Sequence, residues 1–215
     1  MRCQNEDHLR RDWRVRALAP DFDLLDVWRF PVEIEPEVPF ASFVDFLRHA
    51  LQQSGDGKGA AARLFQLRAW LGERFGWDDE AVRHPIPGCE ETSVCERIPA
   101  QDRQEFAPLE MAGPAVEAFE PVYEDPDEIL LELSNATVHA LLHLGRDPLE
   151  STQGTDGRWA PLMAVYAKPR GFLGRAYMAA IGPFRHGIVY PSLMRRVRSA
   201  WPRYLAQHPS ASGSD

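Results

Sequence analysis

The sequence lacks the features that mark several large classes of protein. None of its 215 residues belongs to a run of 18 apolar residues, so no segment is predicted to span a membrane. Residues 1–16 are polar and charged and contain no apolar stretch, which predicts no signal peptide and a cytoplasmic location. The three cysteines, Cys3, Cys89 and Cys95, have no regular spacing, which argues against a disulfide-rich secreted scaffold.

Positive charge is also scarce over most of the chain. Lys and Arg total 24 against 32 for Asp and Glu, a net charge of −8, and this balance argues against nucleic acid as a partner. The charge is unevenly distributed, because residues 168–208 contain eight Lys and Arg and no Asp or Glu. With +8 in that segment, the remainder must carry −16.

The composition that is present, 44% hydrophobic and 26% charged, is typical of a soluble globular protein. We expect a flexible tail over 1–12, a single α+β domain over 13–207 and a disordered tail over 208–215. Apolar spacing and Pro and Gly breaks predict the order of the elements. The expected strands are 24–32, 120–123, 128–133, 137–144 and 161–168, and the expected helices are 42–53, 60–75 and an interrupted C-terminal helix over 173–205.

The hairpin 128–144 is the most informative local pattern. A two-residue turn at Asn135-Ala136 would set Glu132 opposite His139 and Glu128 opposite His143. Residues of the other parity are all apolar, so one face of this hairpin is polar and the other is hydrophobic. In strand 161–168, Tyr166 shares the polar face. One interpretation is an acid–base site of Glu132, His139 and Tyr166, and the alternative is a solvated outer sheet face with paired charges.

Two other patterns resemble functional motifs but do not meet their requirements. His84, Cys89 and Cys95 have no CxxC spacing and no clear fourth partner, so we expect no metal site. The glycine-rich segment 55–59 is not followed by Ser or Thr and follows a helix rather than a strand, so it is not predicted to bind phosphate. We therefore expect no cofactor.

The basic segment 168–208 has three interpretations. Its apolar stripe, with flanking Arg, Trp201 and Tyr204, is typical of a helix at an anionic membrane surface. The arginines could also bind an acidic partner. In the simplest interpretation the stripe packs on the sheet and the arginines contact the acidic remainder of the same chain.

Several stretches together resemble the bacterial family called domain of unknown function 2867, over about 13–201. They are 26–31 (DVWRFP), 85–88 with 91–93, 133–143 (LSNATVHALLH), 168–178, 183–186 and 190–191. The resemblance implies a relation to START-like, helix-grip proteins, in which a curved antiparallel sheet wraps a long C-terminal helix around an apolar cavity. Similar domains also occur fused behind reductase-like NAD(P)-binding domains. The resemblance implies no reaction and supplies no catalytic residues.

The fold class expected is therefore α+β, a helix-grip sheet around a long, kinked C-terminal helix, with two helices inserted after the first strand. The leading functional hypothesis is a small, apolar ligand bound between sheet and helix. The alternatives are a cyclase, isomerase or lyase that uses the Glu–His pair, and a membrane or partner module that uses the basic helix. The expected ligand contacts are Tyr123, Val138, Ala140, Leu142, Trp159, Met163, Val165, Arg170, Arg175, Tyr177, Ile181 and Phe184.

Overall fold

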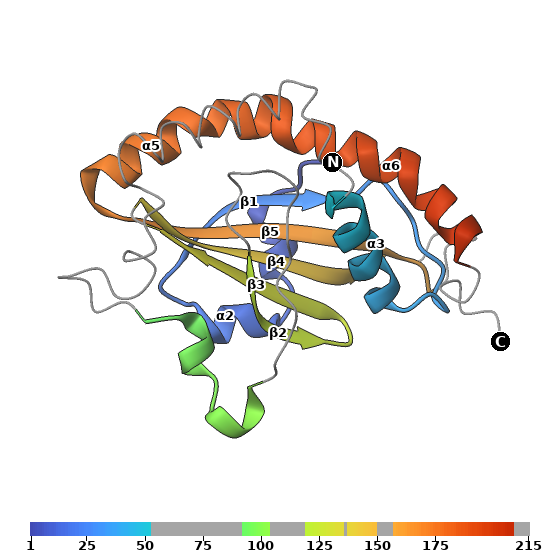
Figure 1. Ribbon diagram of the computed structural model, residues 1–215, viewed down its shortest axis with the longest axis horizontal. Coiled ribbons are helices and arrows are strands. Elements are labelled where there is room, and N and C mark those ends of the chain that lie inside the picture. The colour runs from blue at the N-terminus through green and yellow to red at the C-terminus, as the bar shows by residue number, and fades with distance from the viewer. Residues whose placement is uncertain (53–91, 104–118, 136, 150–156, 209–215) are drawn as a thin grey trace.

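A computed structural model describes the chain except for residues 53–91, 104–118, 136, 150–156 and 209–215. Its centre is an antiparallel sheet with the strand order β1-β5-β4-β3-β2 (Figure 1). The strands are β1 (Asp23–Arg29), β2 (Glu120–Asp125), β3 (Glu128–Ser134), β4 (Val138–Pro148) and β5 (Trp159–Pro169). The helical elements are α1 (Asn5–Leu9), α2 (Arg14–Leu18), α3 (Phe40–Gln52), η3 (Val94–Arg97), η4 (Ala100–Asp102), α5 (Gly171–Phe184), η5 (Arg185–Val189) and α6 (Tyr190–Gln207).

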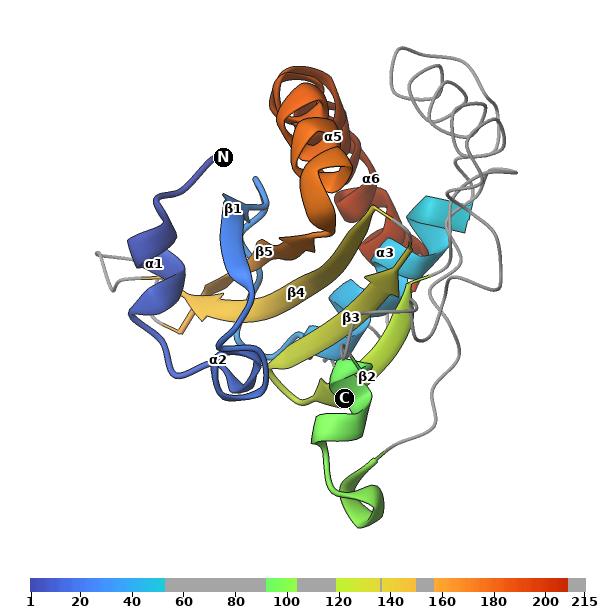
Figure 2. The ribbon, with the colours of Figure 1, turned by 90° about the vertical axis from the view of Figure 1, so that its left-hand side faces the viewer.

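The elements form layers on the two faces of the sheet (Figure 2). The C-terminal helix, α5–η5–α6, crosses one face together with α3, while α2 and η3 lie on the opposite face. The α+β class and the long C-terminal helix are confirmed. The helix-grip arrangement is not confirmed, because the sheet is not strongly curled around the helix.

Each face of the sheet has its own hydrophobic core. On the helix side, Phe43 and Phe46 of α3 meet Trp201 of α6, with ring centroids 5.5 and 5.2 Å apart. On the other side, Trp13, Val15 and other N-terminal residues cover Leu130, Leu141 and Tyr166. Because both faces are covered, the prediction of a solvated outer face is wrong: Glu132, His139 and His143 are all buried.

The hairpin β3–β4 has the predicted faces but a different register. Ser134 pairs with His139 and Glu132 with Leu141, two residues from the predicted pairing. The cause is the turn, where the side-chain Oδ1 of Asn135 accepts hydrogen bonds from the backbone N–H groups of Thr137 and Val138, at 2.9 and 3.0 Å. A shift of two residues leaves every side chain on its original face, because side chains alternate with a period of two.

The N-terminal segment is ordered, so the prediction of a flexible tail over 1–12 is wrong there. The Cys3 backbone N–H donates to the Val27 carbonyl at 2.9 Å, and His8 of α1 is fully buried. Arg11 bonds to the buried Asp147 at 2.7 Å. Because backbone and polar contacts anchor this segment, its position does not depend on a long apolar run.

The remaining expectations vary in outcome. The helix expected over 42–53 is α3, whereas the helix expected over 60–75, the glycine-rich segment 55–59, His84, Cys89 and the tail 209–215 lie outside the described residues. Residues 145–148 and 159–160, outside the expected strands 137–144 and 161–168, extend β4 and β5. The C-terminal helix continues through Pro183, and a π-helical turn, η5, follows it. Among the described helices, none combines the length and hydropathy that crossing a bilayer requires.

Substitution of two glycines of α5 by alanine is expected to have opposite effects on stability. A Cβ at Gly174 would collide with the carbonyl oxygen of Thr137, whereas a Cβ at Gly182 would meet nothing within 4 Å. We expect Gly174→Ala to lower the free energy of unfolding by about 2 kcal/mol through overpacking. Gly182→Ala should raise it by about 0.5–1 kcal/mol, because alanine loses less backbone entropy in a helix. Urea unfolding of both variants measures these changes, and a loss of stability in Gly182→Ala would contradict the geometry.

Candidate functional site

The Glu–His pairs predicted from the hairpin exist, but they are sealed inside the protein. Nε2 of His139 lies 2.6 Å from Oε1 of Glu132, and both side chains are at least 94% buried. Glu132 also accepts hydrogen bonds from the Ser93 hydroxyl at 2.6 Å and the Val94 backbone N–H at 2.9 Å. These bonds outweigh the burial that would raise the pKa of Glu132, and they hold that pKa below its usual range.

Tyr166, predicted to join this pair, takes part in a different network. Its hydroxyl lies 3.2 Å from Nδ1 of His8, whose Nε2 lies 3.1 Å from Nδ1 of His143. Nε2 of His143 lies 2.9 Å from Oε2 of Glu128. Tyr123 donates to the same carboxylate oxygen at 2.8 Å.

One proton arrangement satisfies every bond of this network. An ionised Glu128 only accepts, so His143 donates from Nε2 and accepts at Nδ1, and His8 must donate to it from Nε2. Nδ1 of His8 then accepts from the Tyr166 hydroxyl. Both imidazoles are neutral in this arrangement. Burial, followed by the neighbouring His143, lowers the pKa of His8 to about 3, and burial also lowers the pKa of His143.

This network therefore acts as a clasp that holds α1 against the sheet. His8 and His143 are both fully buried, and Tyr166 is 3% exposed, so a ligand in solution does not reach them. Glu132, His139 and Tyr166 are better explained as a buried, hydrogen-bonded polar core than as a catalytic site.

The expected ligand contacts do not all lie in one place. Tyr123 lies on the face away from the C-terminal helix, so it does not face the space between sheet and helix. Trp159 is buried in the helix-side core with its indole N–H on the Glu35 carbonyl, and Arg170 is bound to the Asn135 carbonyl at 2.6 Å. Arg175 and Phe184 are exposed. The half-buried members are Ala140, Leu142, Val165, Tyr177 and Ile181, and the buried ones are Val138 and Met163.

A polar cluster on the helix side was not predicted. Asp26 of β1 is 2% exposed, and its carboxylate contacts Arg185 at 3.1 Å, the Tyr190 hydroxyl at 3.1 Å and Nε2 of His186. We call these four residues the Asp26 cluster. Burial, together with the negative charge of Asp26, raises the pKa of Tyr190, so its hydroxyl stays a hydrogen-bond donor.

Two irregularities of the backbone meet at this cluster. The β1–β5 register shifts between Leu24 and Asp26, which makes Leu25 an extra, bulged residue. Opposite it, η5 inserts a π-helical turn that begins at Arg185 and includes His186. Bulges and π-turns both redirect side chains, and both are common at functional sites. The Asp26 cluster is therefore the candidate functional site of the described residues.

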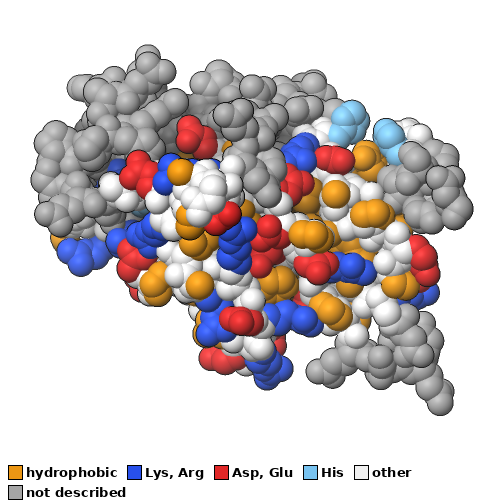
Figure 3. Space-filling view, turned by 90° about the horizontal axis from the view of Figure 1, so that it is seen from below, with side chains coloured by type: hydrophobic (Ala, Val, Ile, Leu, Met, Phe, Trp, Pro, Cys, Tyr) orange, Lys and Arg blue, Asp and Glu red, His pale blue; other side chains and the backbone are white. Residues whose placement is uncertain are grey.

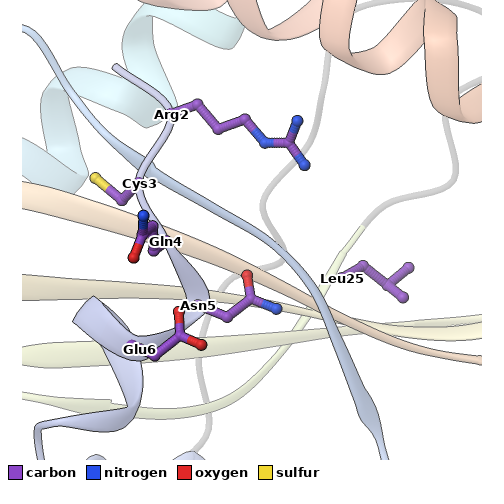
Figure 4. A pocket seen from close by; sticks show the side chains of 6 residues that line it. All are labelled: Arg2, Cys3, Gln4, Asn5, Glu6 and Leu25. Carbon is purple, nitrogen blue, oxygen red and sulfur yellow. The ribbon is translucent and has the colours of Figure 1, made fainter.

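An open hollow of about 550 Å³ lies at the outer edge of β1. Residues 2–6 line one side of it and Leu25 the other, as Figure 4 shows. Arg2 connects this hollow with the Asp26 cluster, since it bridges to Trp28 of β1 and its charge acts on the Tyr190 hydroxyl.

The sequence contained one signal for this cluster. Asp26 opens the stretch 26–31, and Arg185, His186 and Tyr190 fall in 183–186 and 190–191, all of them stretches that carry the family resemblance. Periodicity alone did not connect them, because they are about 160 residues apart and meet only in the folded sheet–helix pair.

Comparison with known proteins gives one positive finding. Residues 18–192 match the family model described as a protein of unknown function, DUF2867. No curated protein and no solved structure matches the chain.

The buried histidine clasp predicts sensitivity to acid. His8 is neutral in the folded state with a pKa of about 3 but protonates near 6.5 when unfolded, so its contribution is complete above pH 6.5 and is lost as the pH falls toward 3. The free energy of unfolding should fall by about 1.4 kcal/mol per pH unit for this one proton. Urea unfolding between pH 5.5 and 4.5 should show a slope smaller by that amount in His8→Gln. The exposed His208→Gln is the control, and an unchanged slope in His8→Gln would contradict the clasp.

Proposed function

The chain belongs to the DUF2867 family of proteins of unknown function, and from its structure we propose that it binds a small, mostly apolar molecule between the sheet and α5. The observation that carries this proposal is a contrast between the two halves of the C-terminal helix. In α6, the inward side chains Met194, Val197 and Trp201 are buried in the core. In α5, the inward side chains Tyr177 and Ile181 remain only half-buried.

The sheet beneath this helix shows the same incomplete burial. Ala140, Leu142 and Val165 point to the helix side and are half-buried, while Val138 and Met163 on the same face are buried. Half-buried apolar side chains on a helix and on the sheet face it crosses can gain free energy by enclosing an apolar molecule, at about 25 cal/mol per Å² of surface removed from water.

The character of α5 supports a mostly apolar ligand. Arg175 is the single charged residue between Gly171 and Phe184, and its side chain is exposed rather than directed at the sheet. Gly182, at the C-terminal end of α5, has open space where a Cβ would stand. Among the described residues, the Asp26 cluster places charged groups at one end of this face, where it adjoins Val165 through the β1–β5 pairing. This division, apolar walls with one polar end, is typical of small-molecule sites and of helix-grip proteins.

Adjacent substitutions in α5 test this proposal. Ile181→Asp places a charge on the inward face, whereas Ala180→Asp places the same charge on the exposed face. With the neutral fluorescent probe N-phenyl-1-naphthylamine, we expect saturable binding to the unaltered protein and about tenfold or more weaker binding to Ile181→Asp, because a carboxylate resists transfer to an apolar site. Ala180→Asp should bind like the unaltered protein.

Native mass spectrometry of the purified protein provides a second readout, a co-purifying small molecule that is lost in Ile181→Asp. Equal probe binding by the two variants, or no saturable binding by the unaltered protein, would contradict the proposal.

The outer surface of the same helix supports a second candidate function, attachment to an anionic lipid bilayer. Phe172 is 84% and Phe184 47% exposed, and the exposed positions between them are Arg175, Ala176, Ala179, Ala180 and Pro183. In α6, Arg195, Arg198 and Arg203 are exposed, and the structure describes no ion pair for any of them. Exposed aromatic groups beside unneutralised cations suit the interface of an anionic bilayer.

Charge argues for a bilayer over a second copy of the chain. Elsewhere the surface carries interspersed charges of both signs, as Figure 3 shows for the side seen from below. Among the ion pairs outside the C-terminal helix, Arg97 bonds to Asp21 at 2.6 Å and Arg14 to Asp125 at 3.0 Å. Along 168–208 no acidic residue is present, so a symmetric pairing of two such surfaces would bring like charges together.

Charge reversal at matched positions tests bilayer attachment. Arg203→Glu lies on α6, and Arg10→Glu changes the net charge equally at an exposed position of the N-terminal segment. We expect sedimentation with phosphatidylcholine vesicles only when they contain phosphatidylserine, and about tenfold weaker partitioning of Arg203→Glu, since each basic residue contributes about 1 kcal/mol at an anionic surface. Arg10→Glu should partition like the unaltered protein. Equal sedimentation with and without phosphatidylserine would contradict bilayer attachment. A stable dimer in the absence of vesicles would also contradict it.

A further inference from the structure

Three carboxylate–imidazole pairs lie in the described part of the chain, and they differ in their access to solvent. The His139 and His143 rings, on Glu132 and Glu128, are at most 2% exposed. The His186 ring, on Asp26, is 33% exposed, although Asp26 itself is 1% exposed in its side chain. Of these pairs, only Asp26–His186 combines a buried carboxylate with an accessible imidazole.

The hydrogen bond to Asp26 sets the proton arrangement of His186. The carboxylate is ion-paired with Arg185 at 3.1 Å and accepts a hydrogen bond from Tyr190, so it acts as an acceptor toward Nε2 of His186. The neutral ring then carries its proton on Nε2 and its lone pair on Nδ1. Within the described residues no hydrogen bond engages Nδ1, which leaves the basic nitrogen available.

The ring is held in place more firmly than an ordinary surface histidine. Arg185 and Tyr190 both contact Oδ2 of Asp26, which leaves Oδ1 for His186, and the bulge at Leu25 fixes the backbone that carries the carboxylate. The π-turn that carries His186 is an insertion whose geometry is set by the helices on both sides. A carboxylate that orients an imidazole and stabilises its protonated form is the usual support of a histidine general base.

The pair also stands at one end of the apolar sheet face. Cross-strand pairing places Leu142 next to Val165 and Val165 next to Asp26. On the helix, Arg185 follows Ile181 by four residues, about one turn. A molecule against Leu142, Val165 and Ile181 therefore has the Asp26 cluster at its end.

We propose that His186 is a general base that takes a proton from an uncharged, largely apolar substrate bound between the sheet and α5, with Asp26 as its positioning residue. The inference rests on the proposed binding function. The substrate class is a cyclic or aromatic molecule with an acidic C–H bond, next to a carbonyl or a ring heteroatom. The proton moves from carbon to Nδ1, and the electron pair of the C–H bond moves toward the electronegative atom of the substrate. The imidazolium is stabilised by Asp26 and returns the proton to product or solvent.

A probe reaction tests the base without knowledge of the natural substrate. In 5-nitrobenzisoxazole, removal of the proton on C3 breaks the ring N–O bond and releases a coloured cyanophenolate, with no other reactant. We expect a saturable rate above that of free imidazole at equal concentration and pH. His186→Gln should lower kcat about 100-fold, within the range that general bases contribute. His208→Gln, an exposed histidine at the C-terminal end of α6, should leave the rate unchanged.

The role of Asp26 is distinguished by its separate effects on kcat and KM. Asp26→Asn should lower kcat while KM changes little, because the imidazolium formed on proton transfer loses its counter-charge. Urea unfolding of each variant shows whether it is folded at the assay pH. An unchanged kcat in a folded Asp26→Asn variant would overturn the positioning role.

Failure of the base and failure of the binding function give different results. Saturable N-phenyl-1-naphthylamine binding with a rate that is equal in the unaltered protein and His186→Gln overturns the base and leaves the binding function standing. Absence of both probe binding and saturable turnover overturns the two together. A His186-dependent rate whose KM rises in Ile181→Asp supports both.

Discussion

The buried charge of Asp26 is the constraint around which the helix side of the protein is organised. A carboxylate removed from water is tolerated only when it is paired and hydrogen-bonded, and Asp26 obtains all its partners from the C-terminal helix. Removal of Asp26, or of its partner Arg185, would leave the other charge without compensation. This requirement accounts for a bulge in β1 and a π-turn in the helix at the same place, since regular backbone on either side would aim the partners differently.

The sheet face away from the C-terminal helix also buries polar groups, but it pairs them differently. Its polar side chains, Glu128, Glu132, His139 and His143, hydrogen-bond to one another, to His8 of the N-terminal segment and to Val94, and both imidazoles are buried. A sheet that is covered on both faces has room for only a few such groups. The division is consistent with one face holding the chain together and the other, where helix and sheet are incompletely buried, carrying the function.

The sequence predicted the strands and the longer helices, but it predicted few of the contacts between side chains. Alternation identified both faces of the β3–β4 hairpin, and the Glu132–His139 contact survived a register error of two residues because that error preserves the faces. Whether the polar face meets water could not be read from the hairpin, since the residues that cover it, such as His8 and Trp13, lie in a charged segment without apolar periodicity. The Asp26 cluster was not predicted because its members are single polar residues inside a strand and a helix. Only the tertiary fold brings them together.

The two halves of the C-terminal helix differ in how closely they pack against the rest of the protein. In α6, large inward residues recur at helical spacing and pack against α3 and the sheet. This packing stabilises the position of the whole C-terminal helix. With α6 and the Asp26 cluster fixed, α5 can span the sheet without filling every contact. Under the two proposed functions, the inward face of α5 encloses an apolar molecule and its outward face meets a bilayer. A helix that did both would bring an apolar substrate from the membrane close to the proposed base, His186.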